Sequence, residues 1–149
     1  MLSWWHETCA ILLVGILFPG RFQPLWCALR ILLADDHREA VEALAACFTL
    51  AGFSVRVAHD STEALDIAIQ WRPDVALSDI DMPNLDGLDL ARRLRANDRT
   101  RHIVLIAVTA RDTVDETRQA FEAGFEYHVL KPAQPEKLLT MVKACLEWV

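Results

Sequence analysis

The sequence has little of what marks cysteine-ligated metal sites, nucleic-acid-binding proteins or secreted proteins. Its four cysteines include no CxxC pair and no metal-ligand spacing, which is typical of reduced thiols in a cytosolic protein. Its 15 Lys and Arg residues are outnumbered by 21 Asp and Glu residues, and the net charge of −6 argues against a general nucleic-acid binder. No internal repeat or low-complexity tract interrupts the 149 residues, so we expect one domain with a proper core.

The first 28 residues differ in composition from the rest of the chain. They contain three of the five tryptophans but only one basic residue, Arg21. The apolar run from Cys9 to Phe18 is about half the ~20 residues that a membrane span needs, and Glu7 precedes it where a secretory signal has positive charge. Three interpretations remain open: a segment that associates weakly with membranes, a helix packed on the domain, or an extension upstream of the natural start. A clean domain start near Leu29 favours the last.

From residue 29 onward, short apolar runs alternate with amphipathic segments. The apolar runs predict five strands, and apolar residues spaced three or four apart predict a helix after each strand. The expected strands span about 30–34, 54–58, 75–79, 103–108 and 125–130, and the expected helices about 37–51, 60–70, 88–96, 114–123 and 135–148. This alternation implies an α/β fold, a doubly wound parallel sheet covered by helices on both faces. The chain is too short for a closed eight-stranded barrel.

Polar and charged residues stand where the predicted strands end. Asp35 and Asp36 follow the first strand, Asp79 the third, Thr109 the fourth and Lys131 the fifth. The carboxyl ends of parallel strands share one edge of the sheet, where ligand chemistry gathers. We therefore expect three carboxylates, a hydroxyl and an ammonium group to face a single crevice. For Asp79 alone a turn-capping role is the simpler interpretation, but the other strand ends favour a functional one.

Clustered carboxylates repel one another, and a hard divalent cation removes that repulsion. Mg²⁺ prefers oxygen ligands in octahedral geometry and keeps several waters. Asp36 and Asp79 could supply carboxylate oxygens, Asp81 its backbone carbonyl, and Asp35 a contact through water. So sparse a ligand set leaves coordination positions open for phosphate oxygens.

The remaining polar groups suit phosphoryl transfer, which needs mostly positioning and charge stabilisation. Lys131 could neutralise one phosphate oxygen as a point charge, and the Thr109 hydroxyl could donate a hydrogen bond to another. Asp79 is central enough to be the nucleophile. Pro83 stops the strand before it, and Gly87 permits a tight return into the next helix.

Four stretches, taken in order, resemble the receiver domain of bacterial two-component response regulators. They are ILLADD (31–36), LSDIDMPNLDG (77–87), AVTA (107–110) and AGFEYHVLKP (123–132). Their order and spacing match the family over residues 29–149. The resemblance implies a flavodoxin-like (βα)5 fold, with five parallel strands in the order 2-1-3-4-5. We expect residues 29–149 to form the receiver domain and residues 1–28 to be an N-terminal extension.

The resemblance also implies a role in a phosphorelay. Asp79 is expected to accept a phosphoryl group from a phosphohistidine of a sensor histidine kinase or phosphotransfer protein, with Mg²⁺ at Asp35, Asp36 and Asp79. Thr109 and Lys131 are expected to grip that group and report it to the face made by the fourth helix, fifth strand and fifth helix. A phospho-dependent downstream protein, or a second copy in a homodimer, would bind this face. Such a cytoplasmic signalling domain phosphorylates and dephosphorylates only itself, so we expect no enzyme and no direct contact with nucleic acid.

Some positions depart from the commonest family pattern. Three residues before Lys131, where the family often has a Tyr or Phe that moves inward on phosphorylation, this chain has His128. The resemblance implies a switch residue that moves toward Thr109; the alternative is an ordinary half-exposed surface histidine. Asp81 and Arg111 flank the expected site, and charged side chains at such positions are more often solvated than functional.

Two other functions fit parts of the pattern. Asp79-Ile80-Asp81 also resembles the Asp-x-Asp motif of haloacid-dehalogenase-type phosphatases, although there the nucleophile normally ends the first strand and a cap domain needs more length. A receiver-like module that binds a partner without being phosphorylated is the other alternative, and the complete set of site residues argues against it. No helix-turn-helix follows the last expected helix, so, if this is the whole protein, we expect output to pass through a partner. A receiver domain cut from a hybrid kinase would have the same sequence, so the stand-alone and hybrid-kinase types both remain open.

We predict that residues 1–28 are dispensable for folding and phosphorylation. A chain that starts at Leu29 should melt at the same temperature as the full chain and be labelled by acetyl phosphate at the same rate. The reason is that every expected core and site residue lies after this point. Thermal melting and intact mass provide the comparison. An insoluble or clearly less stable shortened chain would instead support a segment packed on the domain.

Overall fold

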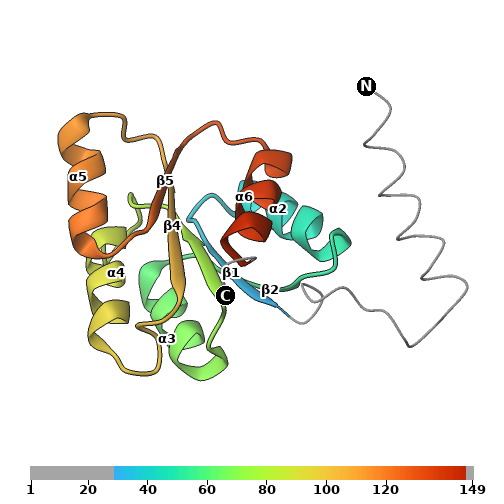
Figure 1. Cartoon of the computed structure of the whole chain (residues 1–149), viewed down its shortest axis with the longest axis horizontal. Coiled ribbons are helices and arrows are strands. Elements are labelled where there is room, and N and C mark those ends of the chain that lie inside the picture. The colour runs from blue at the N-terminus through green and yellow to red at the C-terminus, as the bar shows by residue number, and fades with distance from the viewer. Residues whose placement is uncertain (1–28, 147–149) are drawn as a thin grey trace, which may run out of the picture.

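The computed structural model describes residues 29–146, in which five strands and five helices alternate (Figure 1). The strands are β1 (Arg30–Ala34), β2 (Ser54–Ala58), β3 (Val75–Ser78), β4 (Val104–Thr109) and β5 (Tyr127–Leu130). The helices are α2 (Arg38–Leu50), α3 (Ser61–Trp71), α4 (Gly87–Ala96), α5 (Val114–Ala123) and α6 (Pro135–Leu146). Every predicted element is present, although β5 begins two residues later than expected. The expected end of the last helix at residue 148 lies outside the described residues.

The five strands form one parallel sheet in the order β2-β1-β3-β4-β5, which confirms the predicted topology. β1 sits between β2 and β3, so that Leu33 pairs in register with Val57 on one side and Leu77 on the other. Helices α2 and α6 cover one face, and α3, α4 and α5 cover the other (Figure 1). None of the described helices has the length and apolar character needed to cross a membrane.

Each face of the sheet has its own hydrophobic core. Successive side chains of a strand point to opposite faces, so Ile31 and Leu33 join the cluster under α2 and α6, while Leu32 joins the cluster under α3, α4 and α5. All four residues of β3 are buried because helices cover both of its faces. The edge strand β2 alternates between exposed and half-buried residues until Ala58.

Local side-chain hydrogen bonds fix where helices begin. Asp60 accepts a bond from the Glu63 amide at 2.8 Å, and the Glu63 carboxylate accepts from the His59 amide at 2.7 Å. Because the second bond comes from the residue before Asp60, the two bonds do not form a capping box. A full capping box occurs instead at α5, between Thr113 and Glu116.

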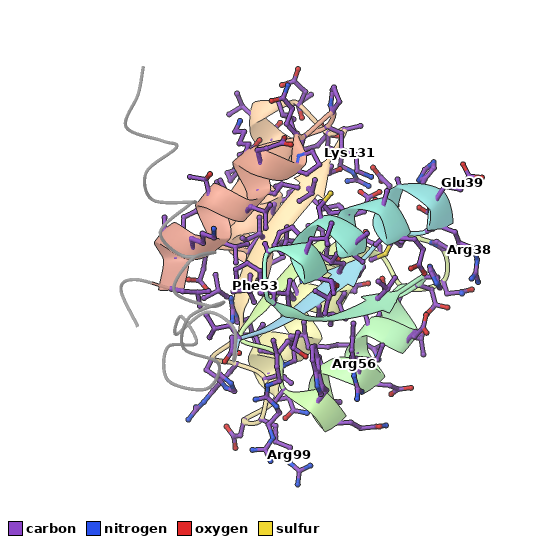
Figure 2. All side chains as sticks on the ribbon, turned by 90° about the vertical axis from the view of Figure 1, so that its right-hand side faces the viewer. Arg38, Glu39, Phe53, Arg56, Arg99 and Lys131 are labelled. Atoms are coloured by element: carbon purple, nitrogen blue, oxygen red, sulfur yellow. The ribbon has the colours of Figure 1, made fainter. Side chains whose placement is uncertain are left out.

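The carboxyl ends of the strands all lie at one end of the molecule. Lys131 marks that end, and Arg99, in the connection before β4, lies at the opposite end (Figure 2). The loops after the strands are therefore the segments that carry the predicted site residues to a common place.

Candidate functional site

Backbone hydrogen bonds continue beyond the strand ends and hold the site residues in place. The Asp79 amide donates to the Ala34 carbonyl at 2.9 Å, and the Lys131 amide donates to the Thr109 carbonyl at 2.9 Å. These bonds extend the ladders between β1 and β3 and between β4 and β5. The positions of Asp79 and Lys131 are thus set by the sheet rather than by flexible loops.

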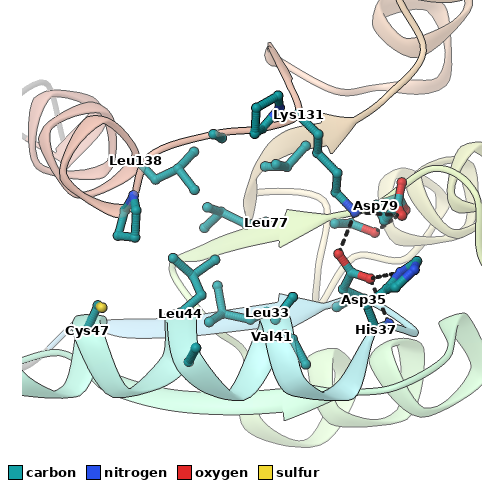
Figure 3. Close-up of a pocket in the computed structure, with 18 residues that line it drawn as sticks. Leu33, Asp35, His37, Val41, Leu44, Cys47, Leu77, Asp79, Lys131 and Leu138 are labelled. Carbon is teal, nitrogen blue, oxygen red and sulfur yellow. Dashed lines mark hydrogen bonds and ion pairs between the residues drawn. The ribbon is translucent and has the colours of Figure 1, made fainter.

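The Lys131 ammonium group is the centre of the site. Its Nζ atom lies 2.7 Å from Asp35 Oδ2 and 3.0 Å from Asp79 Oδ2, although Lys131 and Asp35 are 96 residues apart in the sequence (Figure 3). Burial alone would lower the pKa of Lys131, but the hydrogen bonds with both carboxylates outweigh it and raise that pKa. Burial likewise acts to raise the pKa of Asp35, and the bonds from Lys131 and the His37 amide overcome it and lower that pKa.

Three carboxylates and one imidazole meet at the end of β1 and β3. One potential ligand atom from each of Asp35, Asp36, His37 and Asp79 lies within 4.8 Å of the others. The His37 amide donates to Asp35 Oδ1 at 2.9 Å, and its Nδ1 atom lies 3.2 Å from Asp36 Oδ1. The clustered carboxylate oxygens are the donor set that suits a hard divalent cation such as Mg²⁺. Sequence reasoning missed His37, whose only signal was its place directly after the acidic pair.

Asp79 is buried, with 6% of its surface exposed, and both of its carboxylate oxygens have partners. Oδ2 faces Lys131, and Oδ1 accepts a hydrogen bond from the Asp81 amide at 3.2 Å. The Ser78 hydroxyl donates to the Asp79 backbone carbonyl at 2.9 Å. The carboxylate is therefore oriented from two sides.

Asp81 and Arg111 pair with each other instead of being separately solvated. The Arg111 guanidinium donates from Nε at 2.9 Å and from Nη2 at 2.5 Å, both to Asp81 Oδ1. This hydrogen bonding lowers the pKa of Asp81 and raises that of Arg111. The pair joins the loop after β3 to the loop after β4.

Thr109 and His128 lie on the same face of the sheet. Thr109 is fully buried, and its Oγ1 accepts a hydrogen bond from the Arg111 amide at 3.3 Å. His128 pairs in register with Ala107, two residues before Thr109, so the alternation along β4 puts both on the side of α5. His128 is half-buried, and its Nε2 atom is buried with no hydrogen-bond partner among residues 29–146. His128 thus combines a half-buried side chain with one buried ring nitrogen.

An apolar pocket of about 580 Å³ opens beside the charged cluster, between α2 and α6 (Figure 3). Its walls include Leu33, Val41, Leu44, Leu77 and Leu138, and the carboxylates and ammonium of the site lie at one end. The sequence pattern assigned these apolar residues to a closed core, because hydrophobic periodicity indicates which face a residue occupies but not how tightly two helices close over it.

The loop between β3 and α4 turns tightly around Asp79. Its Asn84 adopts a left-handed conformation with φ 71°. Gly87 then begins α4 with its amide donating to the Ile80 carbonyl at 2.8 Å. A Cβ atom on Gly87 would lie 2.7 Å from Ile80 Cα and closer still to the Asp79 carbonyl oxygen. Glycine is thus required for close approach of the two backbone segments.

Comparison with known families agrees with this fold. The family described as "Response regulator receiver domain" matches residues 31–143. The chain therefore belongs to the response regulator receiver domain family of two-component signalling. Proteins of this family are signalling domains rather than classical enzymes, they bind Mg²⁺ at an acidic pocket, and they interact with histidine kinases and downstream effectors.

Individual relatives show how far the similarity reaches. The response regulator MprA of Mycobacterium avium is 39% identical over 118 residues, which cover 79% of this chain and 51% of that protein. This chain thus spans about half the length of the curated relatives it matches. The crystal structure of a response regulator from Desulfuromonas acetoxidans has a TM-score of 0.73 and 28% identity, covering 81% of this chain and 98% of that one. The receiver domain of a signal transduction histidine kinase from Syntrophus aciditrophicus has a TM-score of 0.75 and 28% identity, covering 82% and 92%.

We predict that Gly87→Ala destabilises the protein by about 1–3 kcal/mol, the usual cost of forcing extra atoms into a packed site. The close approach to the Asp79 and Ile80 backbone is the reason. Urea unfolding of both proteins measures the difference. At an unhindered helix position the same change stabilises by about 0.4–1 kcal/mol, so an increase in stability would contradict the steric argument.

Proposed function

We propose that this domain accepts a phosphoryl group on Asp79 from the phosphohistidine of a sensor histidine kinase or phosphotransfer protein. The observation that carries the proposal is the buried Asp79 carboxylate, held between the Lys131 ammonium group and the Asp81 amide. An Asp79 oxygen attacks phosphorus, the bond from phosphorus to the histidine nitrogen breaks, and the bonding electrons return to that nitrogen. Asp79 becomes a mixed anhydride with phosphate.

The metal part of the proposal concerns Asp35, Asp36 and Asp79, with the Asp81 backbone carbonyl as a further ligand. Their clustered carboxylate oxygens support Mg²⁺ because they form a hard, anionic donor set. When bound, Mg²⁺ supplies positive charge that offsets the carboxylates and the phosphoryl oxygens. Asp35 is shared, since it already accepts a hydrogen bond from Lys131.

Lys131 and Thr109 are proposed to hold the phosphoryl group. In the unmodified protein Lys131 Nζ contacts Asp35 and Asp79, so its charge is already directed at the carboxylate that reacts. The Thr109 hydroxyl accepts from the Arg111 amide, which leaves its own proton free to be donated to a phosphoryl oxygen. Thr109 reaches that role by moving toward Asp79, and His128 follows into the space it leaves.

The signal is proposed to leave through the face formed by α5, β5 and α6, which correspond to the fourth helix, fifth strand and fifth helix. Of the five large apolar side chains exposed within residues 29–146, four lie on α5 or β5: Val114, Phe121, Tyr127 and Leu130. This supports a downstream protein, or a second copy of the chain, as the partner. The domain acts in the cytoplasm on this proposal, without direct nucleic-acid contact of its own and without turning over a separate substrate.

We predict that Asp79→Asn abolishes phosphorylation and leaves the fold intact. Asn lacks the nucleophilic carboxylate, and the change removes a like charge from an acidic cluster, so stability should hold or rise. Both proteins are incubated with acetyl phosphate and Mg²⁺ and examined by intact mass, with urea unfolding as the folding control. Undiminished labelling of the variant would contradict the assignment. Release of phosphate from many esters would support the phosphatase alternative, and absence of labelling in the parent protein would support the bare binding module.

We predict that Lys131→Ala retains Mg²⁺ binding but slows phosphorylation. The ammonium group pairs with carboxylate and phosphoryl oxygens rather than with the metal, and loss of a cation from an acidic site favours metal binding. Mg²⁺ titration and the labelling rate are compared with those of Lys137→Ala, which alters an exposed lysine of α6. A large loss of Mg²⁺ affinity in Lys131→Ala alone would show that Lys131 has another role.

A further inference from the structure

We propose that Arg111 is a positioning residue of the metal site, acting through Asp81; this inference rests on the metal part of the proposed function. The Arg111 guanidinium makes two hydrogen bonds to one carboxylate oxygen of Asp81, across the gap between the loop after β3 and the loop after β4. Arg111 does not itself contact Asp79. Its effect passes through the backbone of Asp81.

The pair belongs to a continuous series of contacts through the site. The Asp81 amide donates to Asp79 Oδ1 at 3.2 Å, and the Arg111 amide donates to Thr109 Oγ1 at 3.3 Å. Asp81 therefore orients Asp79 through its backbone amide and Arg111 through its side chain. In the same way, Arg111 orients Thr109 through its backbone amide and Asp81 through its side chain. Fixing the Asp81 side chain also fixes the peptide groups on either side of it, including the carbonyl that would bind the metal.

The surroundings of the two side chains suit a holding role. The Arg111 side chain is 27% exposed, whereas that of Asp81 is 55% exposed. Without Arg111, the half-exposed Asp81 carboxylate would rotate freely in solvent. The loop after β3 that carries Asp81 also contains Asn84, which adopts a left-handed conformation. The half-buried Arg111 guanidinium restrains that freedom. It belongs to the neighbouring loop, whose start is held to the sheet by the hydrogen bond between the Thr109 carbonyl and the Lys131 amide.

Positioning and simple charge make opposite predictions for the Arg111→Gln variant. If only charge matters, removal of a cation beside an acidic cluster tightens Mg²⁺ binding. If Arg111 positions the Asp81 carbonyl, Mg²⁺ binding weakens, by about tenfold, the lower end of what loss of an outer-shell partner costs a metal site. The sign of the change therefore separates the two explanations without any phosphorylation.

The experiment is a calorimetric titration with Mg²⁺ alone on the full chain and four variants. We expect Arg111→Gln and Asp81→Asn to bind about tenfold more weakly, and the double variant to bind no more weakly than either single one, since both break the same contact. The exchanged pair, Asp81→Arg with Arg111→Asp, should recover most of the affinity. Tighter binding by Arg111→Gln, or parent affinity in the double variant, would overturn the proposal in favour of charge alone.

Two further measurements keep the result interpretable. Arg92→Gln is the control, because it breaks the ion pair between Arg92 and Asp89, 2.6 Å apart on the exposed side of α4. This variant should leave the Mg²⁺ affinity unchanged. Amide hydrogen exchange at Asp81 needs no metal, and Arg111→Gln should speed it about tenfold if the pair holds this loop. Unchanged exchange at Asp81 would overturn the positioning role. Failure of the parent protein to bind Mg²⁺ would instead count against the proposed metal site and leave the exchange result to decide the role of Arg111.

Discussion

The site depends on the pairing of one ammonium group with two carboxylates that the parallel sheet forces together. Asp35 directly follows β1 and Asp79 directly follows the neighbouring β3, so the fold places their negative charges side by side whatever their function. Lys131, carried from β5 at the edge of the sheet, reaches both at 2.7 and 3.0 Å. Leaving a buried charge uncompensated is costly, so this contact links the far edge of the sheet to its centre. It also leaves Asp36 and His37 outside the pair, where a cation can approach.

The division of the sheet into two faces separates the tasks of the domain. The face under α2 and α6 ends in the apolar pocket beside the carboxylates. The face under α3, α4 and α5 carries Thr109 and His128, which lie along β4 and β5 toward the exposed apolar side chains. On the proposed function, the switch residues therefore act on one face of the sheet, and the output face of α5, β5 and α6 extends from there around the edge strand β5. The buried His128 Nε2 atom has no hydrogen-bond partner among residues 29–146, so a change in packing at this place on the face could provide one.

Most of the fold and the strand-end residues could be predicted from the sequence, because both follow from simple periodicity. The run Val75 to Ser78 could only be a strand with both faces covered, and a polar residue after such a strand must lie at the carboxyl edge. Contacts that depend on side-chain reach were not readable in this way. Arg111 and Asp81 looked like separate solvated charges because nothing in their spacing of 30 residues specifies that the two loops face each other. The bond from the His59 amide to Glu63 and the pocket between α2 and α6 likewise depend on local geometry and packing.

The two oxygens of Asp79 have different partners, and this asymmetry bears on how the site would respond to modification. Oδ1 accepts from a backbone amide, whose position is fixed, whereas Oδ2 accepts from the mobile end of the Lys131 side chain. On the proposed function, attaching an anionic phosphoryl group to Asp79 would remove the charge of the carboxylate and place negative charge farther out. The Asp81 amide could not follow that charge, but the Lys131 ammonium group could, and its contact with the Asp79 carboxylate would weaken as it moved. Interactions that strengthen only as charge moves outward are the ones that favour transfer over mere binding. A lysine on a flexible stem, rather than a rigid arginine, suits the position that must change partners.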